Sequence, residues 1–277
     1  MEKILVPCDF SDAAVQAFRF ALDIARQSDG EIILLSVLEL PVMYDSDLMP
    51  TLNFEESFLK EMKASAGENF KKIKARWAKG GPKVSLVVEY GAISLTIARV
   101  AEQKAADLIV MGTKGASGLK EFFVGSNTEK LVRSSEVPVI AVKKYVKISA
   151  IKNIVFPNAL GKGQEELLMR VKQLQEFLNA RLHILFVNTP ASFRQDRETR
   201  HQLRDFAKRF MLKDYTLNIF NDLDQESGVR NFTHQIGADM IAMATHGRRG
   251  LNHLMSGSIA EDVVNHIDCP IWTSVEK

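Results

Sequence analysis

The apolar residues of this chain fall into short continuous runs and longer stripes, and the same order of runs and stripes occurs twice. Lys3–Pro7 and Asn153–Pro157 are apolar runs that stop at a proline, and the two prolines are 157 − 7 = 150 residues apart. Proline cannot donate a hydrogen bond to a neighbouring strand, so such a run is typical of the end of a buried strand. The pattern therefore predicts an internal repeat.

Each of these strands is followed by a predicted helix and a second strand. In the first half, apolar residues at three- and four-residue spacing predict a helix over residues 12–27 with Ser11 as its N-cap. Residues 31–37 then form another apolar run. The second half repeats this order, with a helix predicted over residues 164–179 and a strand over residues 182–187.

The later parts of the two halves also match, at a shorter offset. Ala106–Met111 parallels Ala238–Met243, and 243 − 111 = 132. The same offset relates two further pairs of segments, Gly125-Ser126 with Gly257-Ser258 and Val137–Ile140 with Cys269–Trp272. The difference between the offsets, 150 − 132 = 18, predicts 18 extra residues in the first half, between positions 37 and 83.

The segment that contains the extra residues consists of a predicted loop and a long predicted helix. Residues 38–53 contain two prolines, and residues 54–79 carry an aromatic stripe at helical spacing, with a shorter counterpart at 196–212. Such stripes are typical of helices that pack on a core. The loop has three interpretations: a segment packed on its own helix, a lid over a binding site, or a contact with another subunit.

Each half therefore reads as five strands alternating with four helices. The strands are continuous apolar runs, which favours parallel strands covered on both faces. We predict an α/β protein of two tandem doubly wound domains, residues 1–146 and 151–277, each with a five-stranded parallel sheet. The two domains are expected to pack as an internal pseudo-dimer through their last strands, Pro138–Lys143 and Pro270–Val275.

Composition excludes fewer classes of function than the repeat does. The 277 residues carry 36 Lys and Arg against 34 Asp and Glu, a formal charge of +2, which predicts neither a nucleic-acid nor a membrane partner, although it leaves room for a local patch. No stretch reaches the ~18 uncharged apolar residues of a membrane span. Two cysteines and the absence of a signal-peptide pattern at the start favour a cytoplasmic protein.

Candidate chemistry gathers where the predicted strands end. In a doubly wound sheet, ligands bind beyond the carboxyl ends of the strands. Glycines let the backbone approach an anion and take positive φ, and a helix start favours negative charge. Asp9 is placed to bind a ribose or a Mg²⁺ brought by phosphates, and Ser126, Thr128 and Lys114 add hydroxyl groups and a positive charge. Taken singly, these glycines also fit turns, and Ser126 also fits a helix cap.

These residues resemble a known family. Gly112-x2-Gly115-x9-Gly125-Ser126, together with Pro7-x-Asp9, is similar to the signature of ATP-binding universal stress proteins. The resemblance covers nearly the whole chain as two copies and implies a fold like that of the adenine-nucleotide α-hydrolase-like domains. It implies ATP as the ligand, with ADP and AMP as alternatives, Mg²⁺ with the nucleotide, and a homodimer. The predicted nucleotide-binding residues are Pro7, Cys8, Asp9, Val37, Met111, Gly112, Thr113, Lys114, Gly115, Gly125, Ser126, Asn127 and Thr128.

The second half departs from this pattern. Ala159 stands where the first half has Asp9, and Ala244 stands where it has Gly112. We therefore predict one competent site, in the first half, and a degenerate second site formed by Ala159, Ala244, Gly247, Gly257 and Ser258. Asn158 is a partial substitute for the missing acid. Arg248 and Arg249 either attract an anion or belong to a solvated loop.

Competing motifs are weak. The chain contains no Gly-x4-Gly-Lys-Ser/Thr loop, and no Gly-x-Gly-x2-Gly follows a strand. His246 and His253 lack the nearby acid or cysteine that a metal site needs. Cys8 is either redox-sensitive or a buried structural thiol.

Three functions stay open at this point. The first is an ATP-binding stress and signalling module that acts on an unknown protein partner through a ligand-dependent conformation. The second is a slow Mg²⁺-dependent ATP hydrolase with at most weak activity, because no general base or arginine finger stands in a motif. The third is a nucleotide-free scaffold or a carrier of a small apolar ligand.

Overall fold

The computed structural model describes residues 1–39, 52–113, 125–161, 164–245 and 267–275. The strands of the first half are β1 (Lys3–Pro7), β2 (Glu31–Leu38), β3 (Val84–Tyr90), β4 (Leu108–Gly112) and β5 (Val139–Val142). Its helices are α1 (Asp12–Ser28), α2 (Leu52–Trp77), α3 (Ile93–Gln103) and α4 (Ser126–Ser134).

The second half repeats this order. Its strands are β6 (Asn153–Pro157), β7 (Arg181–Asn188), β8 (Tyr215–Asn221), β9 (Met240–Thr245) and β10 (Ile271–Val275). Its described helices are α5 (Glu165–Leu178), α6 (Asp196–Arg209) and α7 (Gln225–Ile236), with short 3₁₀ turns η1 (Ile148–Ala150) and η2 (Pro190–Ser192). The predicted elements that fall within the described residues are confirmed, with boundaries shifted by up to three residues, and the fourth helix expected in the second half lies outside them.

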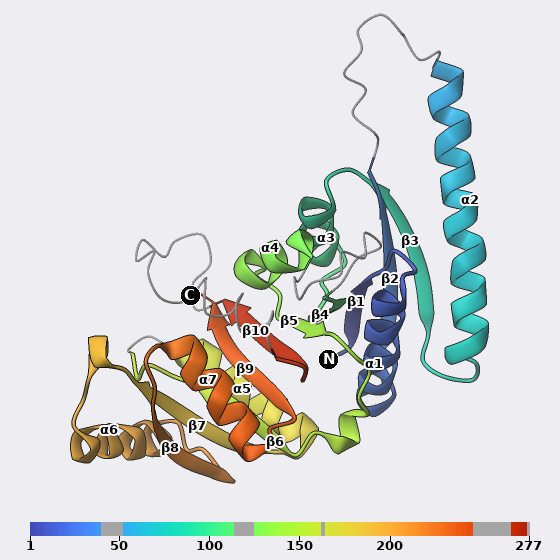
Figure 1. The fold of residues 1–277 in the computed structure, drawn as a ribbon. Helices are drawn as coiled ribbons and strands as arrows, with labels where there is room; N and C mark the ends of the chain where they lie inside the picture. The colour runs from blue at the N-terminus through green and yellow to red at the C-terminus, as the bar shows by residue number, and fades with distance from the viewer. Residues whose placement is uncertain (40–51, 114–124, 162–163, 246–266, 276–277) are drawn as a thin grey trace, which may run out of the picture.

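All ten strands belong to one sheet, in the order β3-β2-β1-β4-β5-β10-β9-β6-β7-β8. Within each half the strands are parallel, as the continuous apolar runs predict. The halves meet where β5 and β10 pair antiparallel, with Ile140 opposite Trp272. Figure 1 shows this junction at the centre of the molecule, with β3 and β8 at the two outer edges of the sheet.

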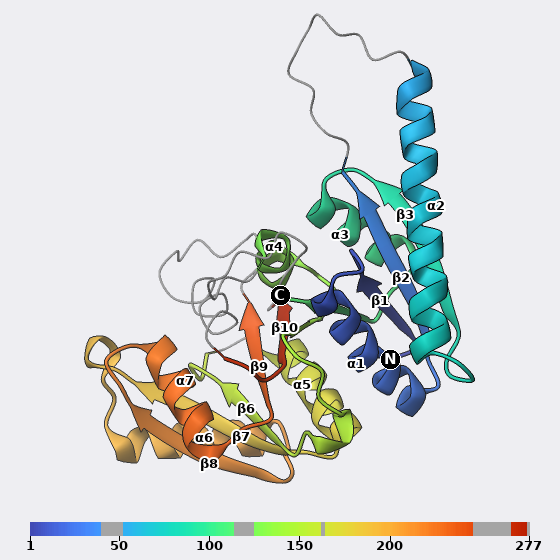
Figure 2. The same cartoon turned by 45° about the vertical axis from the view of Figure 1, so that its right-hand side comes forward.

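Helices cover both faces of the sheet because neighbouring strand residues point to opposite sides. Ile4 and Val6 pack with α1, α2, α5 and α6 in one core, while Leu5 packs with α3, α4 and α7 in the other. Figure 2 shows α1 and α2 on one side of the first-half strands and α3 on the other. The outer aromatic stripe of α2 packs on the first core through Phe70 and Trp77, as its spacing predicts.

Side-chain contacts hold the halves together around the linker, residues 143–152 between β5 and β6. Tyr145 in the linker donates its hydroxyl hydrogen to the Asp23 carboxylate of α1, at 2.9 Å. Its ring and that of Trp77 lie 4.0 and 4.2 Å from the Arg19 guanidinium carbon. Gln27 of α1 donates to the backbone carbonyl of Phe177 in α5. The linker is therefore packed against the first half rather than extended into solvent.

Candidate functional site

The turn after β1 is built by side chains that bond to nearby backbone. The Cys8 amide donates to the Leu35 carbonyl at 2.8 Å, and the Cys8 Sγ accepts from the Phe10 amide at 3.4 Å. Phe10 takes φ = 62°, an uncommon value for a large side chain. Asp9 is exposed, and its Oδ1 accepts from the Ser11 amide at 3.0 Å and the Ser11 hydroxyl at 2.6 Å. The turn thus presents a carboxylate at the carboxyl edge of the sheet.

Ser11 connects this carboxylate to α1. Its Oγ accepts from the Ala14 amide at 3.3 Å, which makes Ser11 the N-cap, as predicted. The sequence pattern predicts the cap and Asp9 separately and does not predict the bond between them. The spacing Asp9-x-Ser11 carried that signal, because a serine two residues after an acid can bond both to it and to the helix start.

Burial determines the chemistry of Cys8. The side chain is 5% exposed, and burial raises the pKa of its thiol to about 12. Because the reactive form of cysteine is the thiolate, the thiol is inert near neutral pH. The structural interpretation of Cys8 is therefore favoured over the redox-sensitive one. Burial also raises the pKa of the Cys269 thiol to about 12.

Gly112 lies at the end of β4, directly against the start of α1. A Cβ placed on Gly112 would be 2.7 Å from the backbone carbon and oxygen of Ala13. The position therefore requires glycine for close packing. Neither glycine uses the positive φ open to this residue type: Gly112 lies outside the left-handed region, and Gly125 has φ = −58°. At Gly112 the close approach of α1 to β4 accounts for the glycine. Gly125 has extended backbone just before α4.

The start of α4 is tied back to the end of β4. The Gly125 amide donates to the Thr113 carbonyl at 2.7 Å, and the buried Thr128 hydroxyl donates to the Gly112 carbonyl at 3.0 Å. Gly125, rather than Ser126, is the N-cap, and Ser126 is exposed in the first turn. The first-turn amides of a helix lack intrahelical acceptors, so this end suits an anion.

Four of the remaining predicted residues are described by the structure, and the others are not. Pro7 ends β1, and Val37 lies on the neighbouring strand β2, in register with Glu89. Met111 is 5% exposed and packs in the core shared with α4. Asn127 is partly buried in the first turn of α4. Lys114, Gly115 and the 40–51 part of the predicted lid loop lie outside the described residues.

Both halves contain a buried threonine hydroxyl without a partner at the same place. Thr113 follows β4 and Thr245 ends β9, at 2% and 1% exposure. Within the described part of the chain, neither Oγ1 has a hydrogen-bond partner. A buried polar atom without a partner costs about 1–3 kcal/mol. Such an atom calls for a water molecule or a ligand oxygen.

The second half keeps the turn but not its chemistry. The Asn158 amide donates to the Leu185 carbonyl at 2.9 Å, and Leu160 takes φ = 60°. The Asn158 side chain accepts from the Leu160 amide at 2.6 Å and donates to Gln164 at 2.8 Å. It therefore occupies the place of Cys8, not of Asp9, and Ala159 at the edge offers no acceptor side chain.

The helix that follows this turn also begins later. Counterparts 150 residues apart would start α5 at residue 162, but it starts at Glu165, with buried Gln164 as N-cap. Ala244, the counterpart of Gly112, is partly buried at this place. The other predicted residues of the second site, Gly247, Gly257 and Ser258, lie outside the described residues, as do His246, His253, Arg248 and Arg249.

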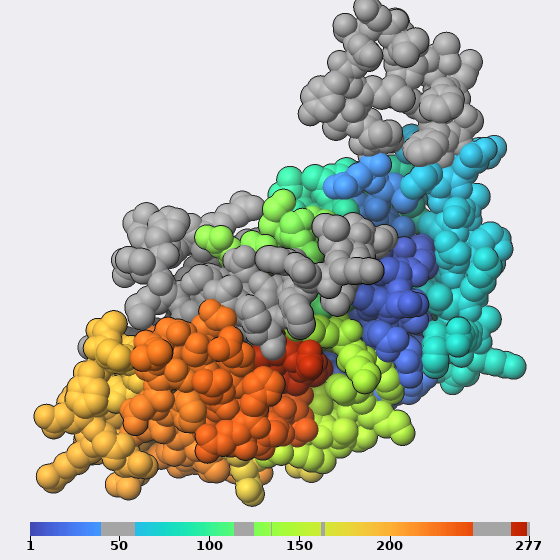
Figure 3. All heavy atoms as spheres, viewed as in Figure 1, coloured from blue at the N-terminus to red at the C-terminus, as the bar shows by residue number. Residues whose placement is uncertain are grey.

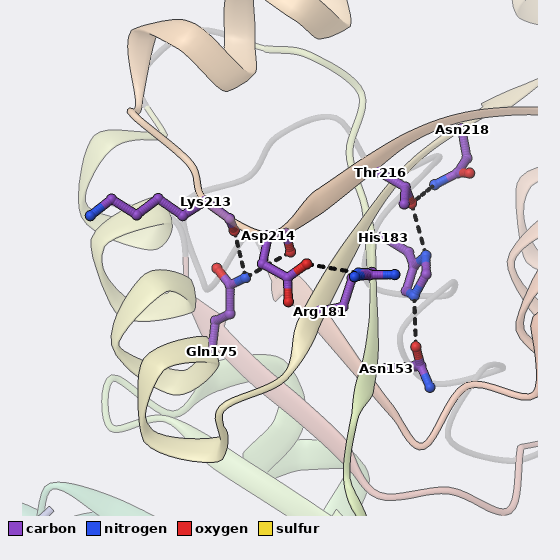
Figure 4. A network of polar contacts seen from close by, with 8 residues as sticks. All are labelled: Asn153, Gln175, Arg181, His183, Lys213, Asp214, Thr216 and Asn218. Atoms are coloured by element: carbon purple, nitrogen blue, oxygen red, sulfur yellow. Dashed lines mark hydrogen bonds and ion pairs between the residues drawn. The ribbon is translucent and has the colours of Figure 1, made fainter.

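A separate polar network lies at the amino ends of β6, β7 and β8, at the opposite edge of the sheet from the candidate site (Figure 4). Asn153 donates to the Asp239 carboxylate at 3.3 Å, so its carbonyl oxygen faces His183 Nε2 at 3.1 Å. That oxygen can only accept, so Nε2 carries the proton and Nδ1 accepts from Thr216 at 2.8 Å. Burial first, and then Arg181, lowers the pKa of His183. The network is internally paired and fixes strand register.

The described residues contain neither a metal-binding cluster nor a membrane-spanning helix. No group of three or more His, Cys, Asp or Glu side chains there is placed to hold a metal ion. No described helix combines the length and apolar character needed to cross a bilayer.

Comparison with known proteins decides the family. The model of the Universal stress protein family matches residues 1–143 and 222–274. This chain belongs to that family. The matched regions include the carboxyl-edge turn of the first half and the last strands of the second half.

Individual family members support this assignment over half of the chain. A universal stress protein of Methanocaldococcus jannaschii is 32% identical over 143 residues, which are 52% of this chain and 82% of the relative. The protein YxiE of Bacillus subtilis is 30% identical over 145 residues, 51% of this chain and 98% of the relative. The crystal structure of a universal stress protein from Archaeoglobus fulgidus covers 99% of this chain and 98% of its own, with 21% identity and a TM-score of 0.77. That likeness extends the shared fold over both halves.

Proposed function

We propose that this universal stress protein binds an adenine nucleotide, ATP with Mg²⁺, in its first half and acts as a stress-signalling module. The exposed Asp9 carboxylate and the start of α4 lie at the same edge of the sheet, after the neighbouring parallel strands β1 and β4, and this placement supports the proposal. A carboxylate suits ribose hydroxyls, and a helix start suits phosphates. ADP and AMP would use the same contacts.

The residues at this edge fit such a ligand. Pro7 and Asp9 would hold the ribose, the Val37 backbone would contact the adenosine, and the first turn of α4 would hold phosphate. Thr128 already donates its hydroxyl hydrogen to Gly112, so its contribution is to position α4 rather than to donate to phosphate. Thr113 offers a buried hydroxyl without a partner among the described residues. Bound Mg²⁺ would neutralise phosphate charge.

The geometry favours binding over hydrolysis. Oδ1 of Asp9 accepts two hydrogen bonds from Ser11, which orient the carboxylate as a fixed acceptor. General base catalysis requires a group that can take a proton from an attacking water. We therefore propose a ligand-dependent signal, with conformation or partner binding as the output.

We further propose that residues 1–146 and 151–277 are two domains that act as an internal pseudo-dimer in the cytoplasm. The antiparallel pairing of β5 with β10 supports this arrangement. The degenerate turn at Ala159 supports a single nucleotide per chain.

Mass spectrometry of the molecule released by denaturing freshly purified protein tests the proposal. ATP at about one per chain is the expected result. ADP together with measurable phosphate release would favour the hydrolase instead. Absence of nucleotide, together with no binding of added ATP and Mg²⁺ by calorimetry, would reject both and favour the scaffold or apolar-ligand carrier. Gly115→Val should abolish binding, because its side chain would fill the predicted phosphate loop.

A further inference from the structure

Helix α6 turns one face to the core and the other to solvent. Thr199, Leu203, Phe206 and Ala207 are buried against β8 and the core, at 7% exposure or less. The opposite face is exposed and rich in cations. Residues 193–213 contain seven Lys or Arg against three Asp or Glu, a local excess of four positive charges in a chain whose total is +2.

Three of these cations lie in one line without ion pairs. Arg200 pairs with Asp196 at 2.8 Å, and Arg209 pairs with Glu165 at 2.5 Å. Within the described residues, Arg197, Arg204 and Lys208 make no ion pair, and all three are exposed. Spacings of seven and four residues put them on one helix face, over about 16 Å at 1.5 Å per residue.

Two large apolar side chains are exposed to solvent near the beginning of this helix, one just before α6 and the other just after β8. Phe193 is 72% exposed and Leu223 is 82% exposed. Asn188 brings them to one corner, because its side chain accepts from the Arg194 amide at 2.8 Å and its carbonyl accepts from the Asp222 amide at 3.1 Å. Each of these two donors is the chain neighbour of an exposed apolar residue.

This corner lies at the free end of the ten-stranded sheet. Strand β8 is the last strand of the sheet, and α6 packs beside it. Figure 1 shows α6 at the outer end of the second half, and in Figure 3 the same end of the molecule is open to solvent. The exposed face of α6 is therefore accessible to a large, flat partner.

We propose that the exposed face of α6, formed by Arg197, Arg204 and Lys208 with Phe193 and Leu223 at its corner, binds the surface of an anionic lipid bilayer. Unpaired cations are attracted to anionic headgroups. Single protruding apolar side chains enter the acyl boundary without a matching pocket, which a protein or nucleic-acid partner would have to supply. Because these cations are exposed, added salt screens their attraction to the headgroups, so we expect the binding to be salt-sensitive. The site is separate from the proposed nucleotide site.

Co-sedimentation with vesicles tests this site. The full-length protein should bind vesicles of phosphatidylcholine and phosphatidylglycerol in equal parts at low salt, and not vesicles of phosphatidylcholine alone. The variant R197Q/R204Q/K208Q should partition at least about tenfold less, because each cation near the surface contributes to the attraction. F193S/L223S should also reduce partition.

The matched control is K60Q/K63Q/K72Q on α2, which removes the same charge from exposed positions of the corresponding first-half helix. This control should bind vesicles like the wild type. Equal loss in both triple variants, or wild-type failure to bind the anionic vesicles, would overturn the proposal. Binding to single-stranded RNA without binding to vesicles would overturn it in favour of a nucleic acid. Unchanged circular dichroism and nucleotide stoichiometry in all variants separate this result from misfolding and from failure of the proposed function.

Discussion

The turns after β1 and β6 have the same backbone form and different chemistry. Both place a large residue in the left-handed region, Phe10 at φ = 62° and Leu160 at φ = 60°. In both, the side chain two residues earlier accepts from that residue's amide. Only the first turn then carries an exposed acid, Asp9, joined to a helix cap. The same backbone turn can therefore form with or without an acid at the edge of the sheet.

The helix starts show a linked difference. In the first half α1 begins close to the turn, and its Ala13 backbone occupies the space beside Gly112. In the second half α5 begins three residues later relative to the repeat, and Ala244 replaces the glycine. Gly112 therefore serves helix packing in this protein, in addition to the phosphate contact proposed for it.

The substitution Asp9→Ala should have the largest effect, and the property that it changes is nucleotide binding. The affinity for ATP with Mg²⁺ should fall about 10- to 100-fold, since hydrogen bonds to a charged group contribute about 1.5–3 kcal/mol. Calorimetry measures this. Asp12→Ala is the control, because it removes an exposed carboxylate three residues away. Unchanged affinity in Asp9→Ala would reject the proposed site.

The reverse exchange in the second half should not create a site. Ala159→Asp with Ala244→Gly restores the two lost residue types, but Gln164 and Asn158 stay bonded to each other and α5 still begins late. We expect one nucleotide per chain in this variant. Two per chain would show that the second pocket is merely eroded.

The next effect is on stability. Gly112→Ala should lower the free energy of unfolding by about 1–3 kcal/mol, because the new Cβ overlaps the Ala13 backbone. Ala244→Gly should cost about 0.5–1 kcal/mol from backbone entropy. Urea unfolding measures both changes in free energy. It is followed by the fluorescence of Trp77 in the first half and Trp272 in the second. Equal losses in the two variants would contradict the packing role of Gly112.

A smaller effect concerns alkaline pH. The Cys8 and Cys269 thiols have pKa values raised to about 12 by burial, so the folded state keeps them protonated. Their stabilising contribution is complete below the unfolded pKa near 9 and is lost as pH rises toward 12. Each thiol should contribute a slope of up to about 1.4 kcal/mol per pH unit in that window. Urea unfolding at pH 8 and pH 10 measures this. The free energy of unfolding should fall less between these pH values in Cys8→Ala than in the wild type, and Cys269→Ala is the matched variant.

The smallest effect is at the buried threonines. Thr245→Val should raise the free energy of unfolding by about 1 kcal/mol, because it replaces a buried hydroxyl that has no partner in the described residues. Thr113→Val should do the same without nucleotide and weaken ATP binding if its hydroxyl contacts the ligand. Thermal unfolding with and without ATP distinguishes these cases. Destabilisation by both variants would indicate ordered water at both hydroxyls.

Much of the candidate site was predictable because it depends on local order. The apolar run ending at Pro7 and the Ser11 cap placed Asp9 beside a helix start. The reason for Gly112 was not predictable, because Ala13 is distant in sequence and meets Gly112 only when β1 and β4 become neighbours. The hydrogen bond from the Thr128 hydroxyl to the Gly112 carbonyl likewise depends on how α4 packs. Cys8 could be recognised as near the site, but its raised pKa follows from burial that only the packed core provides.

The residue pattern alone was enough to predict the repeat, the succession of strands and helices, the parallel strands within each half, the meeting of the halves at their last strands and the loss of the acid at Ala159. These follow from apolar periodicity and residue identity, which act over a few neighbouring residues. The packed structure was needed to show that β5 and β10 pair antiparallel in one continuous sheet, that Ala13 lies against Gly112, and that Arg197, Arg204 and Lys208 stand without ion pairs along one exposed helix face among the described residues. These features depend on which surfaces meet and which charges find partners, and residues far apart in the chain settle both.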